Sequence, residues 1–241
     1  MGKTTTAVNL SALVAEAGKR VLLIDLDPPG NATSGLGQSE TDSNPVYEVL
    51  LGEVKARDAI VPTGFGTLDL MPTSIELAGA EIELVSVENR EMLLKNALSD
   101  MKGDYEYIFI DCPPSLSLLT LNALTAADSV LIPIQCEYYA LEGVGQLVNT
   151  VKLMRRKLNP ALKVEGILLT MYDARTNLCA QVVQEVRNHF REEAFDTMIP
   201  RNVRLSEAPS YGMPIHLYDA KCTGAQAYRE LANELIERNE V

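Results

Sequence analysis

The sequence predicts an α/β domain with a doubly wound, mostly parallel sheet. Four apolar runs indicate buried strands at 21–25, 107–111, 129–133 and 166–170, and shorter candidates lie at 68–71 and 195–199. These runs are nearly continuous rather than alternating, which is typical of strands covered on both faces. Stretches with helical periodicity separate them, and strand–helix alternation indicates parallel strands joined by crossover helices.

The helices are expected between and after these strands. Their predicted ranges are 4–17, 77–99, 115–126, 141–158, 178–191 and 224–238. The segment 35–66 is rich in Gly, Ser, Asp and Pro, so we expect a surface excursion with one short helix near 46–51. Neither a low-complexity linker nor an internal repeat divides the chain, which favours a single domain over 1–241.

Composition limits the possible partners. The chain has 241 residues, 46% of them hydrophobic, and a formal net charge of −12. An acidic protein repels a polyanion over most of its surface, so any nucleic-acid contact must come from a local basic patch. The sequence shows neither a signal peptide nor an apolar run of membrane-spanning length, so we expect a cytoplasmic protein.

The cysteines are widely spaced and form no CxxC pair. They are Cys112, Cys136, Cys179 and Cys222. The favoured interpretation is that they are small buried residues in a reducing compartment. An iron–sulfur site shared between subunits stays open as the alternative.

Gly2-Lys3-Thr4 matches the end of a Walker A loop, GxxxxGK[ST]. Lys3 would supply a positive charge to nucleotide phosphates, and the Thr4 hydroxyl would ligate Mg²⁺. This short match also fits a solvated helix cap. The next elements favour the phosphate site, because a helix is followed by a strand that ends in two acidic residues. The motif, the helix and the acid-ended strand together match the first strand–helix–strand unit of a P-loop NTPase fold without its first strand.

A complete loop needs about four more residues and a strand before Gly2. That strand would be central in the sheet, and its absence would expose two neighbouring strand edges and a large apolar area. We therefore expect that the natural start lies upstream, and that Met1 stands where a valine codon was read as a start.

Acidic residues end two of the predicted strands. Asp25 and Asp27 are two residues apart and are expected to share a face, while Asp111 follows the apolar run 107–110 as in a Walker B motif. At the carboxyl ends of parallel strands, such carboxylates can hold Mg²⁺-bound water and orient an attacking water. A turn that caps a helix is the structural alternative for 25–31.

With these motifs the chain resembles the ParA/Soj family, within the deviant Walker A ATPases that also include MinD. The resemblance spans essentially the whole chain, and its blocks lie at 2–10, 25–28, 30–37, 111–116, 137–143 and 199–210. The blocks Glu137-Tyr138-Tyr139-Ala140-Leu141-Glu142-Gly143 and 199–210 are specific to the Soj-like branch.

The resemblance implies roles for individual residues. Lys3 and Asp27 would be catalytic, with Asp27 positioning the hydrolytic water. Mg²⁺ would be surrounded by Thr4, Asp25 and Asp111, and ATP would contact Gly2, Lys3, Thr4, Thr5, Pro200, Arg201 and Asn202. Arg175 and Arg204 would bind DNA across an ATP-bound dimer, with Arg187, Arg191 and Arg201 as further candidates.

Two departures from the family pattern are evident. The signature lysine that reaches the partner's nucleotide would lie before residue 1, and Pro29 replaces the usual Gln beside Asp27. The resemblance implies an ATP- and Mg²⁺-dependent partition ATPase, nucleoid-associated, that dimerises, coats DNA non-specifically and is triggered by a ParB-like partner. No membrane partner is expected.

Two alternative functions remain open from the sequence. A MinD-like membrane-cycling ATPase should end in a basic amphipathic helix, whereas 226–241 is rich in Glu. The other rival is a truncated paralogue that binds partners or DNA without hydrolysing ATP.

Overall fold

A computed structural model describes residues 2–38, 45–137 and 140–240. Its strands are β1 Val21–Asp25, β2 Val61–Phe65, β3 Leu68–Met71, β4 Tyr107–Asp111, β5 Ser129–Gln135, β6 Lys163–Tyr172 and β7 Ala194–Pro200. Every strand predicted from the sequence is present, with ends that differ by a few residues. The chain is therefore an α/β protein with parallel sheets.

In the described residues the strands form two sheets, ordered β2-β3-β1-β4 and β5-β6-β7. Their neighbours are parallel except for the antiparallel pair β2–β3. β1 lies inside the first sheet and every one of its residues is buried. Its register with β4 pairs Asp25 with Asp111, which brings the two predicted carboxylates to the same end of the sheet.

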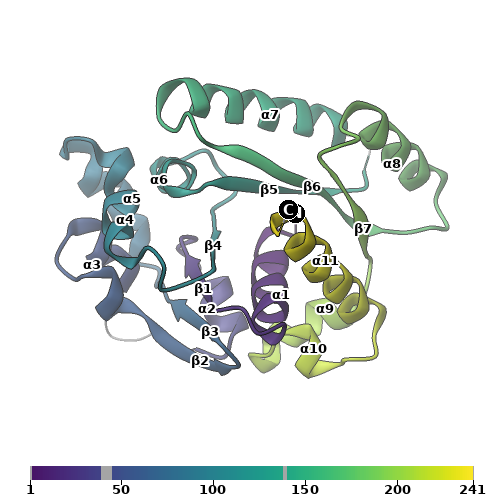
Figure 1. Cartoon of the computed structure of the whole chain (residues 1–241), viewed down its shortest axis with the longest axis horizontal. Coiled ribbons are helices and arrows are strands. Elements are labelled where there is room, and N and C mark those ends of the chain that lie inside the picture. Colours follow the sequence, from purple (N-terminus) through teal and green to yellow (C-terminus); the bar gives the residue numbers. More distant parts are fainter. Residues whose placement is uncertain (1, 39–44, 138–139, 241) are drawn as a thin grey trace.

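Helices cover both faces of these sheets (Figure 1). The α-helices are α1 Lys3–Glu16, α2 Asn31–Gly35, α3 Pro45–Leu51, α4 Leu77–Glu83, α5 Leu93–Ala97, α6 Leu118–Ala126, α7 Ala140–Lys157, α8 Asn177–His189, α9 Arg204–Glu207, α10 Ile215–Tyr218 and α11 Thr223–Asn239. Short 3-10 turns are η1 Ala56–Ala59, η2 Leu84–Ser86, η3 Arg90–Met92, η4 Ser99–Met101 and η5 Ala208–Tyr211.

The prediction of one helix over 77–99 is wrong. The chain leaves the helical conformation at Val87, which is extended, and again at Asn89, which is left-handed with φ 54°. Val85, Ser86 and Val87 are poor helix formers, because branching at Cβ restricts the side chain and serine competes for backbone hydrogen bonds. The segment therefore consists of α4, α5 and intervening 3-10 turns.

The prediction for 35–66 is incomplete. It places the helix α3 correctly, but η1 and the strand β2 were not expected. Pro62 and Gly64 obscured the strand in the sequence. β2 lies at the edge of its sheet, where proline is tolerated because one side of the strand needs no ladder hydrogen bonds.

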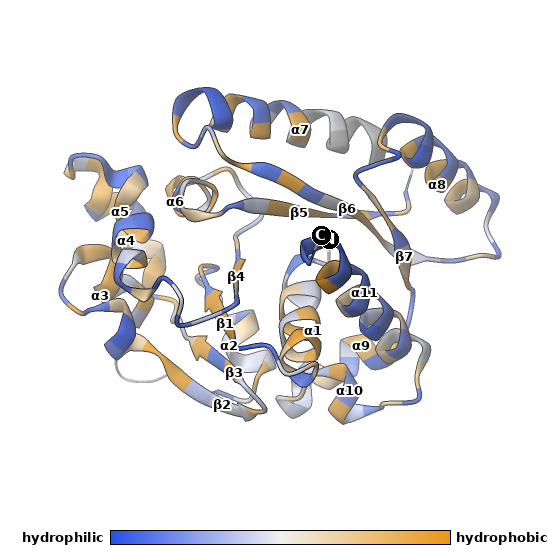
Figure 2. Ribbon diagram, in the orientation of Figure 1, coloured by the Kyte–Doolittle hydropathy of each residue, from blue (hydrophilic) through white to orange (hydrophobic). Residues whose placement is uncertain are grey.

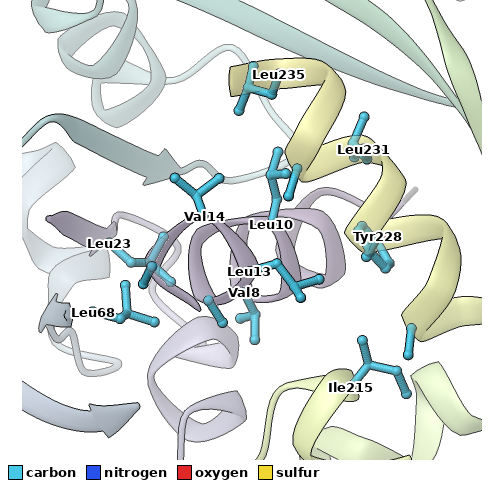
Figure 3. Packing of buried hydrophobic residues seen from close by; sticks show 14 of the residues in the cluster. Val8, Leu10, Leu13, Val14, Leu23, Leu68, Ile215, Tyr228, Leu231 and Leu235 are labelled. Atoms are coloured by element: carbon cyan, nitrogen blue, oxygen red, sulfur yellow. The ribbon is translucent and has the colours of Figure 1, made fainter. Parts of the chain in front are cut away.

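The largest core cluster surrounds α1 (Figure 3). α1 packs against β1 and β3 on one side, where Val14 lies near Leu23, and against α11 on the other. A buried hydrogen bond of 3.1 Å joins the Thr6 hydroxyl to the Tyr228 hydroxyl of α11. The Asn9 side-chain oxygen accepts a hydrogen bond of 2.7 Å from the backbone N–H of Ile215. Contacts with α10 and α11 thus fix the helix that begins at the Gly2-Lys3-Thr4 motif.

A slot of about 580 Å³ separates β4 from β5. The neighbouring edges of both strands line it, with α1 and α11 contributing along one side and α6 and α7 along the other. Ile108 of β4 is 38% exposed, although the equivalent positions of β1 are fully buried. In the described residues β4 and β5 are thus each at the edge of their own sheet, and the predicted single sheet is divided at this slot.

Candidate nucleotide and metal site

The first turn of α1 lies at the carboxyl ends of β4 and β6. Gly2 caps this helix with φ 90°, a left-handed conformation that favours glycine. A Cβ atom on Gly2 would lie 3.5 Å from the side chain of Thr170, at the end of β6. The backbone N–H groups of the first turn and the helix dipole thus face the sheet edge where anions bind in such folds.

Asp25 is fully buried at the end of β1, and its oxygens already have partners. Oδ2 accepts hydrogen bonds from the backbone N–H and the hydroxyl of Thr33, at 2.8 and 2.9 Å. Oδ1 accepts one from the backbone N–H of Asp27, at 3.1 Å. Burial raises the pKa of Asp25, and these hydrogen bonds oppose the shift. Asp25 therefore holds the loop between β1 and α2 in place.

Asp111 is 3% exposed, and its Oδ2 has no hydrogen-bond partner among the described residues. Burial raises its pKa to about 7, the Thr4 hydroxyl opposes this shift, and the charges of Asp25 and Asp27 add to it. An unpartnered buried oxygen close to Thr4 fits a bound cation, which would favour the ionised carboxylate.

Within the described ranges, no group of three or more His, Cys, Asp or Glu side chains is arranged to hold a metal ion. Mg²⁺ takes few protein ligands and completes its octahedron with water and phosphate oxygens. Thr4 and Asp111 are the residues whose positions suit such an ion.

Asp27 follows β1 and is partly exposed. Burial raises its pKa, and the positive charge of Lys3 lowers it. Lys3, Asp27 and Asp111 therefore lie near enough for their charges to influence one another. Thr5 lies one residue further along α1, where its backbone carbonyl accepts a hydrogen bond of 2.7 Å from Asn9.

The segment predicted to surround adenine continues from β7. The backbone N–H of Arg201 donates to the carbonyl of Tyr172 at 3.0 Å, so Pro200 and Arg201 lie beside the end of β6. The Asn202 amide donates to the Thr223 hydroxyl at 2.8 Å. These residues lie at the same end of the second sheet as Thr170, whose side chain is close to Gly2.

The two arginines predicted to bind DNA are exposed but paired. Arg175 donates from Nε and from its terminal nitrogen to the Asp173 carboxylate, at 2.8 and 2.7 Å. Arg204 lies 2.8 Å from Glu207 and 3.5 Å from Asp219. The Arg175 guanidinium holds the pKa of Asp173 well below its usual range. Each positive charge is thus balanced by an adjacent carboxylate.

Thr33 is a site residue that the sequence reasoning missed. Its hydroxyl accepts a hydrogen bond of 3.2 Å from the backbone N–H of Thr73 while donating to Asp25. It therefore ties the end of β1 to the loop after β3. The sequence feature that could have identified Thr33 is its hydroxyl side chain within the block 30–37, one of the blocks of family resemblance.

The block 137–143 falls mostly outside the residues whose side chains the structure describes.

Cys136 and Cys179 are buried, as predicted, and the Cys179 thiol donates to the Cys136 carbonyl at 3.5 Å. Cys112 and Cys222 are half-buried, and all four cysteines are free. Among the helices described, none is both long and apolar enough to cross a bilayer.

A family model described as an AAA domain matches residues 1–164. The sporulation initiation inhibitor protein Soj of Bacillus subtilis is 58% identical over 236 residues, which cover 98% of this chain and 93% of that protein. The chromosome partitioning protein ParA of Myxococcus xanthus is 54% identical over 240 residues, covering 99% and 85%.

Among solved structures, a cobyrinic acid a,c-diamide synthase of Mycobacterium smegmatis, with a bound ATP analogue and magnesium, has a TM-score of 0.86 and is 41% identical. The alignment covers 99% of this chain and 91% of that one. The identity and coverage of the curated relatives, together with the acid-ended strands around α1, place the protein in a family: the chain belongs to the ParA/Soj chromosome-partitioning proteins.

Proposed function

We propose that the protein is a Mg²⁺-dependent ATPase that drives DNA partition. The observation that carries this proposal is the unpartnered oxygen of Asp111 beside Thr4, at the start of a helix that begins with Lys3. Lys3 would neutralise phosphate charge, and Thr4 and Asp111 would hold Mg²⁺ directly or through water. Bound Mg²⁺ would supply charge neutralisation of the phosphates.

Asp27 is the candidate for orienting the attacking water. It lies close enough to Lys3 for that charge to affect its pKa, and it is only partly buried, so solvent can reach it. A carboxylate in this position accepts a hydrogen bond from water and aligns it with a phosphate held at the start of α1. Asp25 supports this geometry through its bond to the Asp27 backbone.

The active form is proposed to carry an extended strand in the slot between β4 and β5, followed by a turn into Gly2. The slot has two parallel strand edges and apolar walls, and it ends beside Lys3 and Asp111. Such a strand would bury the exposed part of Ile108. The turn after it would add the backbone N–H groups that a complete phosphate loop presents to the nucleotide.

In the partition cycle that family membership suggests, ATP binding would close a homodimer on DNA and a ParB-like partner would stimulate hydrolysis. The relatives that are 54–58% identical are named as Soj and as a chromosome partitioning protein, whereas the solved structure named as a synthase is 41% identical. The membrane-cycling alternative is disfavoured, because the apolar residues of α11, including Tyr228 and Leu231, are buried against the rest of the protein.

Nucleotide retention tests this function. The chain and a version extended by a strand and loop before Gly2 would be titrated with a fluorescent ATP analogue, with and without Mg²⁺. We expect Mg²⁺-dependent binding in the extended form, at least ten-fold weaker binding in its Lys3→Ala variant, and ATP hydrolysis that Asp27→Ala abolishes. Binding without hydrolysis in both forms would instead support the non-hydrolysing module, and binding unaffected by Lys3→Ala would refute the site.

A further inference from the structure

Four cations gather at the end of α7, in a region that sequence reasoning did not single out. They are Lys152, Arg155, Arg156 and Lys157, here called the α7 basic cluster, and all are exposed. The stretch 143–164 contains neither Asp nor Glu, although the whole chain has 33 acidic residues. Figure 2 shows this end of α7 as hydrophilic.

In the part of the chain that the structure describes, the ion pairs are formed by cations outside the α7 basic cluster. The cluster therefore has no acidic partner among the described residues. Lys152 is three residues from Arg155 and four from Arg156, so the three side chains lie on one helix face and repel one another. The helix dipole offsets part of this repulsion at a C-terminus. The remaining positive charge faces solvent.

The backbone beneath the cluster is held firmly. Val151 and Met154, in the same turns of α7 as the cluster, are buried in a small core together with Leu162. The Asn159 amide donates to the carbonyls of Leu124 and Ala127, at 3.0 and 2.7 Å, which ties the end of α7 to the end of α6. The cluster is therefore a row of cations on a fixed surface.

The cluster lies at the opposite end of the sheet from the nucleotide site. α7 ends shortly before β6 begins at Lys163, whose backbone N–H donates to the carbonyl of Asp128 just before β5. Lys3 and Thr170 lie near the carboxyl ends of the strands instead. A ligand on the cluster would leave the nucleotide site uncovered. The Asp128 carboxylate makes no ion pair with a described cation, so it does not neutralise the cluster.

We propose that the α7 basic cluster binds the phosphate backbone of double-stranded DNA. Arg175 and Arg204 have adjacent carboxylates that DNA phosphates would have to replace, whereas the cluster has none among the residues that the structure describes. A bilayer is a poorer fit, because Leu153 is the exposed apolar side chain within 152–157 and the other apolar residue there, Met154, is buried. The choice of DNA as the partner rests on the proposed function. The choice of this surface rests on the positive charge of the cluster and on the packing that holds the end of α7 in place.

Equilibrium binding of a labelled random-sequence duplex, followed by fluorescence anisotropy over a range of salt concentrations, tests the proposal. The variant is Lys152→Gln/Arg155→Gln/Arg156→Gln in the full chain. We expect at least ten-fold weaker binding at low salt, and a slope of log K against log salt that is shallower by about 3, since each phosphate contact contributes about 0.9.

The matched control changes the same net charge at exposed positions elsewhere: Lys95→Gln/Lys102→Gln/Lys221→Gln. It should weaken binding less than three-fold, and both variants should keep the melting temperature of the parent. Equal effects of the two variants, or no binding by the parent chain at low salt, would overturn the proposal. So would loss of DNA binding in Arg175→Gln/Arg204→Gln while the cluster variant binds normally.

Vesicles containing phosphatidylglycerol form the second arm. Cluster-dependent vesicle binding without cluster-dependent DNA binding would overturn the proposal in favour of a membrane surface. Mg²⁺-dependent retention of the ATP analogue is measured on the same samples. A protein that binds DNA through the cluster but retains no nucleotide would disprove the proposed ATPase function and leave this inference standing.

Discussion

Thr33 donates both its backbone N–H and its hydroxyl to the same carboxylate oxygen of Asp25, at 2.8 and 2.9 Å. Both residues are buried. The pair holds a charged group at the end of β1 without exposing it to water, which requires good hydrogen bonding on every side. The loop that carries Asp27 depends on this arrangement, because the Asp27 backbone donates to the other oxygen.

Replacing Thr33 by Val should therefore destabilise the protein by about 1–3 kcal/mol, because it removes a donor to a buried carboxylate and leaves the Thr73 N–H without its acceptor. Urea denaturation would measure the change. Thr33→Ser keeps the hydroxyl and should cost less. A Val variant as stable as the Ser variant would show that Asp25 does not depend on the hydroxyl.

Asp111→Asn should separate stability from function. In the absence of metal, burial disfavours the charge of Asp111, so the neutral amide should stabilise the folded protein by about 1–3 kcal/mol at pH 8. The same variant should lose Mg²⁺-dependent nucleotide retention at least ten-fold. Asp58→Asn, at an exposed position, is the control for removal of one negative charge and should change neither property.

His216 should make stability depend on pH. Burial lowers the pKa of His216 below its ordinary 6.5, and its Nδ1 has no partner among the described residues. The unfolded chain therefore takes up a proton more readily than the folded one, so folding stability is full above pH 6.5 and falls as the pH drops below it.

His216→Gln should reduce the difference in unfolding free energy between pH 7.5 and pH 5.5. The other histidine of the chain, His189, is exposed, so His189→Gln is the matched control and should leave the difference unchanged. Parallel pH profiles of the parent and the His216 variant would contradict this prediction.

Ile108 should report on whether the slot is filled. In the chain as it stands, Ile108 is 38% exposed, and Ile108→Thr should cost no more than about 1 kcal/mol. With a strand in the slot the same side chain would be buried, and the cost should rise to about 2 kcal/mol or more. Urea denaturation of both forms, each with and without the substitution, measures the difference. Equal costs would show that the added segment lies elsewhere.

The strands and most helices could be predicted because their signals are local. The run 21–25 is apolar throughout, as a strand buried on both faces must be, and the structure buries every residue of β1. β2 was missed because Pro62 and Gly64 argue against a strand, and only its place at a sheet edge permits them. The helix predicted over 77–99 failed because backbone breaks at Val87 and Asn89 override its apolar pattern.

Sequence by itself determined the α/β class, the Gly2-Lys3-Thr4 motif at the start of a helix and the two acid-ended strands, since residue type and spacing carry that information. Tertiary structure decided what each charge does. It showed that Asp25 is fully engaged by Thr33 and Asp27, that Asp111 keeps an unpartnered oxygen, and that Arg175 is balanced by Asp173. These properties depend on burial and on partners distant in the chain or set by local backbone geometry, and only the folded structure brings such groups together.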